Sequence, residues 1–139
     1  NHVRQDIATW CNEHGFALPT LVHPSAVIAS SAILGEGTVV MAGVAVNPYS
    51  VIGRGVILNT GCVIEHDNRI GDFAHLSANA ATGGTVTVGP RSHVGLNATI
   101  LPNQRVGADV TVGAGAVVLS DTEDGVVLVG VPARPLKRD

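Results

Sequence analysis

A repeat of six residues runs without insertion through most of this chain and limits what it can fold into. Every sixth residue from Val22 to Val118 is aliphatic at sixteen of seventeen positions, and the exception is Thr82. The residue two places before each of these is mostly small, although Asn68 and Gln104 break that pattern. Apolar residues at i and i−2 indicate a short strand and a turn, whereas a period of six keeps no stripe on an α-helix. The sequence therefore predicts an all-β fold of short strands.

Glycines mark a longer period of eighteen residues, which predicts how these strands coil. Glycine recurs at this spacing at five positions: Gly35, Gly53, Gly71, Gly89 and Gly107. Three six-residue units would then form one triangular coil with glycine at a repeated corner. Successive coils would stack at the strand spacing of about 4.8 Å. An interior this narrow holds one aliphatic side chain per face, which explains why only 3% of the residues are aromatic.

Composition and charge argue against several other classes of protein. A net charge of −3, one Trp, one Tyr and two Phe do not supply the basic groove and stacking rings of a nucleic-acid binder. No apolar run approaches the roughly 20 residues that span a bilayer. Cys11 and Cys62 form no CxxC pair and no disulfide framework. We therefore expect a cytoplasmic protein that binds neither nucleic acid nor membranes.

An aliphatic residue followed by glycine and four further residues resembles the repeat of the hexapeptide-repeat acyltransferases. This pattern occurs as Ile52-Gly53, Ile70-Gly71, Val88-Gly89 and Val94-Gly95. The resemblance implies a left-handed parallel β-helix of about 5–6 coils, and a homotrimer with active sites between its subunits. We expect this β-helix to cover residues 21–119.

The N-terminal residues 1–20 precede the repeat. They are expected to hold a short helix over residues 3–14 and a lead-in to the first coil. The apolar residues of this helix share one face: Val3, Ile7, Trp10 and Cys11. A helix of this length is marginal alone in water, so we expect it to pack on another part of the chain, such as the open end of the prism.

The C-terminal residues 120–139 are expected to form a closing strand, over residues 126–129, and a tail. The segment from Gly130 to Arg134 reads GVPAR and resembles the tail that borders the coenzyme A channel in many hexapeptide acyltransferases. Arg134, Lys137 and Arg138 place positive charge where a phosphorylated cofactor could use it.

The eighteen-residue period places His66 beside a gap in the next coil. His66 aligns with Gly84 and Glu65 aligns with Gly83, so a histidine flanked by carboxylates faces open space and backbone N–H groups. Acyl transfer from a thioester needs a base for the proton of the nucleophile and donors for the developing oxyanion. His66 suits the first role and the Gly84 N–H the second. Asp67 or Glu65 can fix the tautomer of the imidazole and make it more basic.

Several segments narrow the resemblance to one branch of the family. They are Ile57-Leu-Asn59, Glu65-His66-Asp67, Ile70-Gly-Asp-Phe-Ala-His75 and Val88-Gly89. Together they resemble the nucleotide-amino-sugar N-acetyltransferases of the bacillosamine type and the related sialic acid O-acetyltransferases. Those enzymes carry a preceding Rossmann-like domain that holds the nucleotide sugar. We expect residues 1–20 to be the remnant of such a domain.

The resemblance assigns a role to each candidate residue. It implies that His66 is the general base, that Asp67 raises its basicity, and that the acceptor is a nucleotide sugar lying near Asn59 and Glu65. The residues implied to contact acetyl-CoA are His75, Gly84, Leu96, Ala114 and Arg134. No metal is implied. Cys62 falls in the interior row, so we do not expect it to act as a nucleophile.

Two functions of other classes remain open at this point, because the same prism also carries carbonic anhydrases and structural subunits. A zinc-dependent hydratase would need three converging ligands, for which His66, His75 and His93 are the candidates. A non-catalytic scaffold would need none of these residues. The choice between an amino and a hydroxyl acceptor is also open, since both need the same base and the same oxyanion donors.

Overall fold

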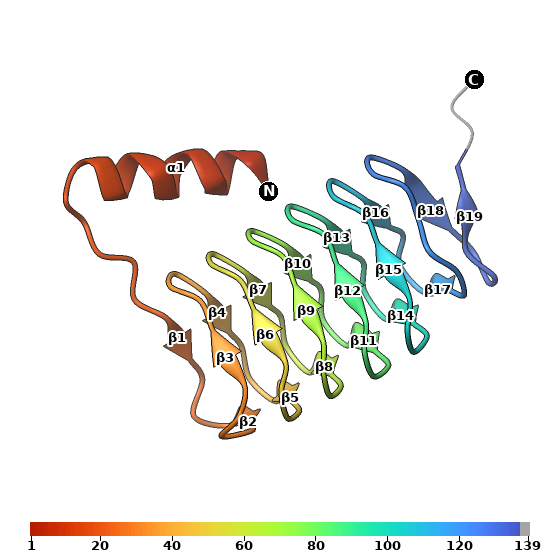
Figure 1. Ribbon diagram of the computed structural model, residues 1–139, viewed down its shortest axis with the longest axis horizontal. Coiled ribbons are helices and arrows are strands. Elements are labelled where there is room, and N and C mark those ends of the chain that lie inside the picture. The colour runs from red at the N-terminus through yellow and green to blue at the C-terminus, as the bar shows by residue number, and fades with distance from the viewer. Residues whose placement is uncertain (137–139) are drawn as a thin grey trace.

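The six-residue repeat folds as short strands joined by turns, and these wind into a parallel β-helix (Figure 1). The computed structural model describes residues 1–136. Residues 137–139, which include the predicted cationic residues Lys137 and Arg138, lie outside the described residues. Each of the first five coils contributes one strand to each of three sheets, so the prism has three faces and three edges. The predicted fold class, a parallel β-helix with a short N-terminal helix, is confirmed.

The three sheets are defined by their strands. The first sheet consists of β1 (Leu21–Val22), β4 (Val39–Val40), β7 (Ile57–Leu58), β10 (His75–Leu76), β13 (His93–Val94), β16 (Thr111–Val112), β18 (Val127–Val129) and β19 (Arg134–Pro135). The second consists of β2 (Val27–Ile28), β5 (Ala45–Val46), β8 (Val63–Ile64), β11 (Ala81–Thr82), β14 (Thr99–Ile100) and β17 (Val117–Val118). The third consists of β3 (Ile33–Leu34), β6 (Val51–Ile52), β9 (Arg69–Ile70), β12 (Thr87–Val88) and β15 (Arg105–Val106).

The register between coils is the one that the glycine period predicts. His75 pairs with His93, and Thr82 pairs with Ile100, each eighteen residues apart. At the C-terminus β18 adds to the first sheet in parallel, and β19 then folds back on it antiparallel. The predicted closing strand therefore lies at residues 127–129, where it ends the core.

The interior of the prism is filled by the aliphatic row. Every sixth residue from Val40 to Val118 is buried, including Thr82 at 3% exposure. The row of small residues is buried at the corners, as at Cys62 and Ala80. Val22, at the open first coil, stays 45% exposed because no coil covers it. This packing confirms that the lack of aromatic residues follows from a core one side chain wide.

The turns of the prism stack into three edges, which we name by what they carry. The base edge joins the second sheet to the third and includes residues 47–50, 65–68, 83–86 and 101–104. The helix edge joins the third sheet to the first and includes residues 53–56, 71–74 and 89–92. The open edge joins the first sheet to the second and includes residues 59–62, 77–80, 95–98 and 113–116.

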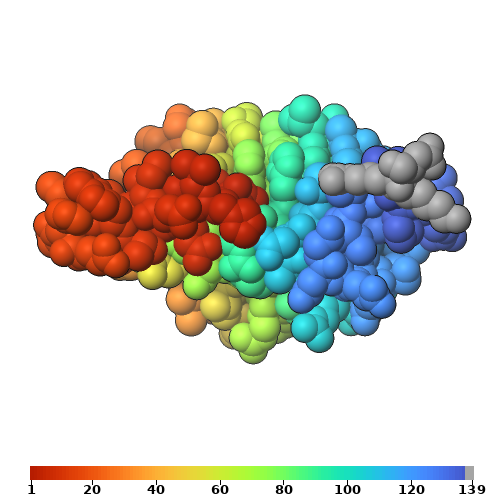
Figure 2. All heavy atoms as spheres, turned by 90° about the horizontal axis from the view of Figure 1, so that it is seen from above, coloured from red at the N-terminus to blue at the C-terminus, as the bar shows by residue number. Residues whose placement is uncertain are grey.

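The N-terminal helix α1 (His2–Glu13) lies along the helix edge, where it covers several coils (Figures 1 and 2). Arg4 fastens it, because its guanidinium donates hydrogen bonds to the carbonyl oxygens of Gly55, Phe73 and Ala74. Asn1 Nδ2 donates to Arg91 O at 2.6 Å. The open end of the prism is therefore not the surface that receives this helix.

The apolar residues Val3, Ile7 and Trp10 do not form the face of α1 that packs on the prism. Val3, Ile7 and Trp10 are 70%, 58% and 52% exposed, and Ala8 is the buried residue of the helix. The turns of the prism present rows of backbone carbonyl groups, which a guanidinium satisfies better than an aliphatic side chain does. Within residues 1–136, no helix has the length and apolar character needed to cross a membrane.

Candidate active site

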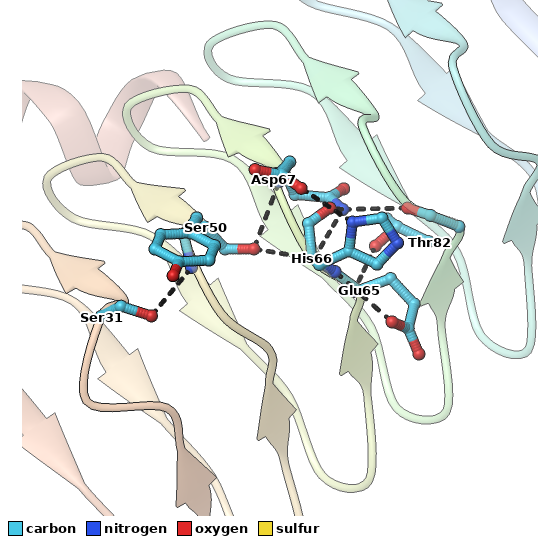
Figure 3. Close-up of polar contacts among 9 residues, drawn as sticks. Ser31, Ser50, Glu65, His66, Asp67 and Thr82 are labelled. Atoms are coloured by element: carbon cyan, nitrogen blue, oxygen red, sulfur yellow. Dashed lines mark hydrogen bonds and ion pairs between the residues drawn. The ribbon is translucent and has the colours of Figure 1, made fainter.

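The base edge carries a close pair between a histidine and a carboxylate. His66 Nδ1 lies 2.8 Å from Asp67 Oδ2 (Figure 3). An ionised carboxylate only accepts hydrogen bonds, so Nδ1 carries the donated proton and Nε2 of the neutral ring keeps its lone pair. The two side chains are 56% and 53% exposed, which leaves Nε2 within reach of a substrate. Glu65 Oε2 accepts a hydrogen bond from the backbone N–H of His66 at 3.4 Å, rather than from the ring.

The turn that presents this pair depends on a left-handed residue. Asp67 has a φ of 58°, and Thr85, one coil further on, has a φ of 60°. Aspartate tolerates this region better than most residues, because its short polar side chain can bond locally. Hydrogen bonds between coils hold the turn from both sides: Asp67 N–H donates to Pro48 O at 3.0 Å, and Thr85 N–H donates to His66 O at 2.9 Å. The backbone that carries His66 is therefore fixed by its neighbouring coils.

Gly84 provides the space that the imidazole occupies. A Cβ atom built on Gly84 would lie 2.5 Å from both Cε1 and Nε2 of His66, so only glycine leaves room for the ring in this position. The Gly84 N–H takes part in no backbone hydrogen bond among residues 1–136. The predicted base and the predicted oxyanion donor are thus brought side by side.

A second group of candidate residues lies on the first sheet and the open edge. Asn59 Oδ1 accepts a hydrogen bond from Thr60 N–H at 2.7 Å, which orients the amide so that Nδ2 faces His75 Nε2 at 3.4 Å. Because Nδ2 only donates, His75 Nε2 is the acceptor and Nδ1 carries the ring proton. The sequence-predicted residues Asn59 and His75 are therefore in contact.

His75 is stacked on His93 in the next coil, with ring centroids 5.0 Å apart. Burial, together with the nearby charges of His93 and Arg4, lowers the pKa of His75 to about 4. Burial also lowers the pKa of His93, whose Nε2 lies 2.8 Å from Ser77 Oγ. His75 is therefore a neutral hydrogen-bonding group near pH 7 and not a cation.

The two groups of candidate residues do not meet within one chain. Glu65, His66, Asp67 and Gly84 lie on the base edge, whereas His75 lies on the first sheet, which is the opposite face of the triangle. Asn59, Leu96 and Ala114 belong to the open edge. A single site that uses both groups would need a second subunit to bring them together.

The remaining predicted cofactor residue, Arg134, lies on β19 at the C-terminal end of the prism. It lines a cavity together with Val118, Leu128 and the turn 119–123, and its Nη1 donates to Ala133 O at 3.0 Å. Asp121 and Glu123 line the same cavity. The cavity therefore has mixed charge, which the basic residues of the sequence did not predict.

The zinc alternative requires three converging ligands. His66 is on the base edge, and His75 and His93 are stacked on the first sheet, so one chain does not bring these three side chains together. Among residues 1–136, no group of three or more His, Cys, Asp or Glu side chains is arranged to hold a metal ion.

Two residues that contact this turn are not among the predicted site residues. The sequence marks Asn68 and Thr82 as breaks in the repeat, with Thr82 next to the Gly83–Gly84 gap, and both are buried against the turn that carries His66. The signal was available, because both breaks lie within one coil of His66.

With its β-helix and its His66–Asp67 pair beside Gly84, the chain has the features of a hexapeptide-repeat acyltransferase. No family model and no curated protein sequence matches it. Several solved structures, however, match the chain closely. The GDP-perosamine N-acetyltransferase of Caulobacter crescentus, a histidine-to-alanine variant in complex with CoA and GDP-perosamine, shares 45% identity at a TM-score of 0.99; the match covers 99% of this chain and 66% of that one.

Two further structures are similar over nearly the whole chain. The acetyltransferase domain of PglB from Neisseria gonorrhoeae, in complex with acetyl coenzyme A, shares 41% identity at a TM-score of 0.96, covering 97% of this chain and 66% of that one. WeeI from Acinetobacter baumannii shares 26% identity at a TM-score of 0.93, and the match covers 96% of this chain and 66% of that one. The chain belongs to the hexapeptide-repeat acetyltransferase family. It spans about 66% of the length of these relatives, just under two thirds.

Proposed function

We propose that this protein transfers an acetyl group from acetyl-CoA to the amino group of a nucleotide-linked sugar, with His66 as general base. The observation that carries the proposal is the His66–Asp67 pair, whose bare Nε2 lies against Gly84. The relatives support it, since one is an N-acetyltransferase bound to CoA and GDP-perosamine and another is an acetyltransferase domain bound to acetyl coenzyme A.

The reaction follows from the protonation states at the base edge. The sugar amine attacks the thioester carbonyl while His66 Nε2 takes the proton of the amine, and Asp67 stabilises the imidazolium that forms. The Gly84 N–H donates to the oxyanion that develops on the carbonyl oxygen. The carbon–sulfur bond then breaks, and the leaving thiolate receives the proton from the His66 imidazolium. An amide and free CoA result, without a covalent enzyme intermediate.

We further propose a homotrimer in which each active site lies between two subunits. The base edge of one subunit would supply Glu65, His66, Asp67 and Gly84, and its neighbour would supply the residues of the first sheet and open edge. The members of this second set are Asn59, His75, Leu96, Ala114 and Arg134. A cytoplasmic location is consistent with the two free cysteines, Cys11 and Cys62.

The test is a thiol-release assay with acetyl-CoA and a panel of nucleotide-linked amino sugars. Because general-base catalysis contributes about 100- to 10,000-fold, His66→Ala should lower kcat by that factor while the oligomer stays intact. His23→Ala, which removes an exposed histidine on the first coil, is the matched control and should keep full activity.

Other results separate the alternatives. Unchanged turnover in His66→Ala would remove the assignment of the base. Transfer to hydroxyl but not amino acceptors would favour the O-acetyltransferase branch. Absence of thiol release from the wild-type protein with every acceptor, in a folded oligomer that binds no CoA, would favour a scaffold.

A further inference from the structure

Two of the buried polar residues of the prism break its repeat, and both meet the turn that carries His66. Thr82 is the exception in the aliphatic row and Asn68 is one of two exceptions in the small row; they are 3% and 0% exposed. Thr82 Oγ1 accepts a hydrogen bond from Glu65 N–H at 3.2 Å. Burying polar groups is unfavourable unless they are hydrogen-bonded, so their position beneath one turn calls for a physical reason.

The amide of Asn68 connects two coils beneath the candidate base. Its Nδ2 atom lies 2.7 Å from Glu65 O, 3.1 Å from His66 O and 2.9 Å from Gly83 O. The first two carbonyl groups belong to the turn that carries His66. The third belongs to the residue before Gly84, in the next coil. One buried side chain therefore touches the backbone on both sides of the site.

The contact with Gly83 has a consequence for the oxyanion donor. The Gly83 carbonyl and the Gly84 N–H belong to the same peptide unit, which is planar and trans, so the two groups point in opposite directions. Because Asn68 draws Gly83 O toward the interior, the Gly84 N–H is turned outward. Backbone hydrogen bonds hold the groups on either side, since Gly83 N–H donates to Ile100 O and Gly84 O accepts from Asn103 N–H. Asn68 bonds to the Gly83–Gly84 peptide unit itself, where two glycines leave the backbone more freedom than other residues would.

Asn68 differs in one respect from the buried hydroxyl groups at other corners of the prism. Hydroxyl groups elsewhere at the corners bond in a regular way: Ser92 Oγ donates to Gly107 O at 2.7 Å and accepts from Val110 N–H at 2.9 Å. Ser50 follows the same rule, donating to Glu65 O and accepting from Asn68 N–H (Figure 3). Asn68 keeps the first half of this rule, since its Nδ2 donates to Gly83 O, but not the second, because its Oδ1 atom is buried without a hydrogen-bond partner among the described residues.

The neighbouring coil shows what stability alone would select at this position. Val86 occupies the same corner one coil later, at 0% exposure, and leaves no polar atom unpaired. An unpaired buried acceptor is a cost to folding that valine would avoid. A cost of this kind, retained beside a reactive group, is typical of residues kept for function.

We propose that Asn68 is a positioning residue for acetyl transfer. It fixes the Gly83–Gly84 peptide plane so that the Gly84 N–H faces the substrate, and it holds the turn of His66 against that peptide. This inference rests on the proposed function, because it assigns the oxyanion donor of that reaction. Asn68 itself is buried and touches no substrate.

The test replaces Asn68 with the residue of the next coil. Asn68→Val should give a folded oligomer with a Tm equal to or above that of the wild type. Its KM for acetyl-CoA should stay within about twofold, while kcat falls roughly 10- to 100-fold, somewhat less than the loss of a whole oxyanion donor. Ser92→Ala is the matched control: it removes a fully buried hydroxyl on the helix edge, and kcat should not change.

A second measurement is independent of turnover. The backbone amide resonance of Gly84 should shift and exchange faster in Asn68→Val than in the wild type, whereas in Ser92→Ala it should not. If the wild-type protein transfers no acetyl group, the proposed function fails, and the Gly84 resonance still tests the tether. An unchanged Gly84 resonance, or a kcat for Asn68→Val within twofold of wild type in an active enzyme, would overturn the role of Asn68. If valine prevents folding, Asn68→Ala, which also removes the donor to Gly83 O, carries the same measurements, with the same outcomes deciding.

Discussion

A methyl group on Gly84 would lie 2.5 Å from His66 Nε2, so these two residues, one coil apart, share the volume of a single side chain. The imidazole of His66 can occupy its position only because the next coil has no side chain there. The ring of His66 and the backbone N–H of Gly84 are neighbours for the same reason. The arrangement of the candidate site therefore depends on the missing side chain of Gly84 as much as on the ring of His66.

The contact between Gly84 and His66 predicts different effects for alanine substitutions at two adjacent glycines. Gly84→Ala should displace the imidazole and lower kcat at least tenfold with a small change in Tm, because the clash falls on a movable side chain. Gly83→Ala should mainly destabilise the protein, since its Cβ would lie 2.6 Å from the backbone nitrogen and Cδ of Pro102. Activity assays and thermal unfolding of both variants check this. A larger Tm loss for Gly84→Ala than for Gly83→Ala would contradict it.

The carboxylate of Asp67 should contribute to catalysis through its negative charge, and its contribution should be moderate. Asp67→Asn keeps an oxygen that accepts from His66 Nδ1 but loses the negative charge that stabilises the imidazolium. Because the pair is more than half exposed, solvent screens the charge, and we expect kcat to fall about tenfold. Asp6→Asn, on the exposed side of α1, is the charge-matched control. Wild-type kcat in Asp67→Asn would show that the carboxylate has no electrostatic role.

The depressed pKa of His75 predicts how stability depends on pH. An unfolded histidine titrates near about 6.5, while the folded pKa of His75 is lowered to about 4 by burial and by nearby His93 and Arg4. Between these values the unfolded chain binds the additional proton, so stability falls as the pH drops through this window; above it His75 contributes no dependence. NMR titration should show the ring of His75 neutral at pH 5.5. In His93→Ala the pKa of His75 should rise, and titration of wild-type His75 near 6.5 would disprove this account.

The two cysteines should differ sharply in reactivity. Burial raises the pKa of Cys62 to about 12, and its side chain is fully buried in the corner row. Cys11, on α1, is partly exposed. Because the thiolate is the reactive form, an alkylating reagent at pH 8 should add one label per native chain, at Cys11, and two after unfolding. Labelling of native Cys62, read by peptide mass spectrometry, would show that the prism opens.

The repeat determined the fold. A period of six with apolar residues at two of its positions is satisfied only by short strands and turns, and the glycine spacing of eighteen set the coil and its register. The pairing of His66 with Gly84 followed from the same arithmetic, since residues eighteen apart stack. For these features, the spacing of residues along the chain is enough to predict which residues are neighbours in the structure.

Other features depended on side-chain geometry that no period encodes. Sequence could not reveal that Arg4 binds backbone carbonyl groups while Trp10 stays exposed, because the carbonyls of separate coils form a surface only after the chain has coiled. The contact of Asn68 with three carbonyl groups likewise needs two coils in place. Finally, the opposite placement of His66 and His75 on a triangular prism is a property of the closed coil. The sequence therefore determined which residues stack, and the tertiary structure decided which of them meet.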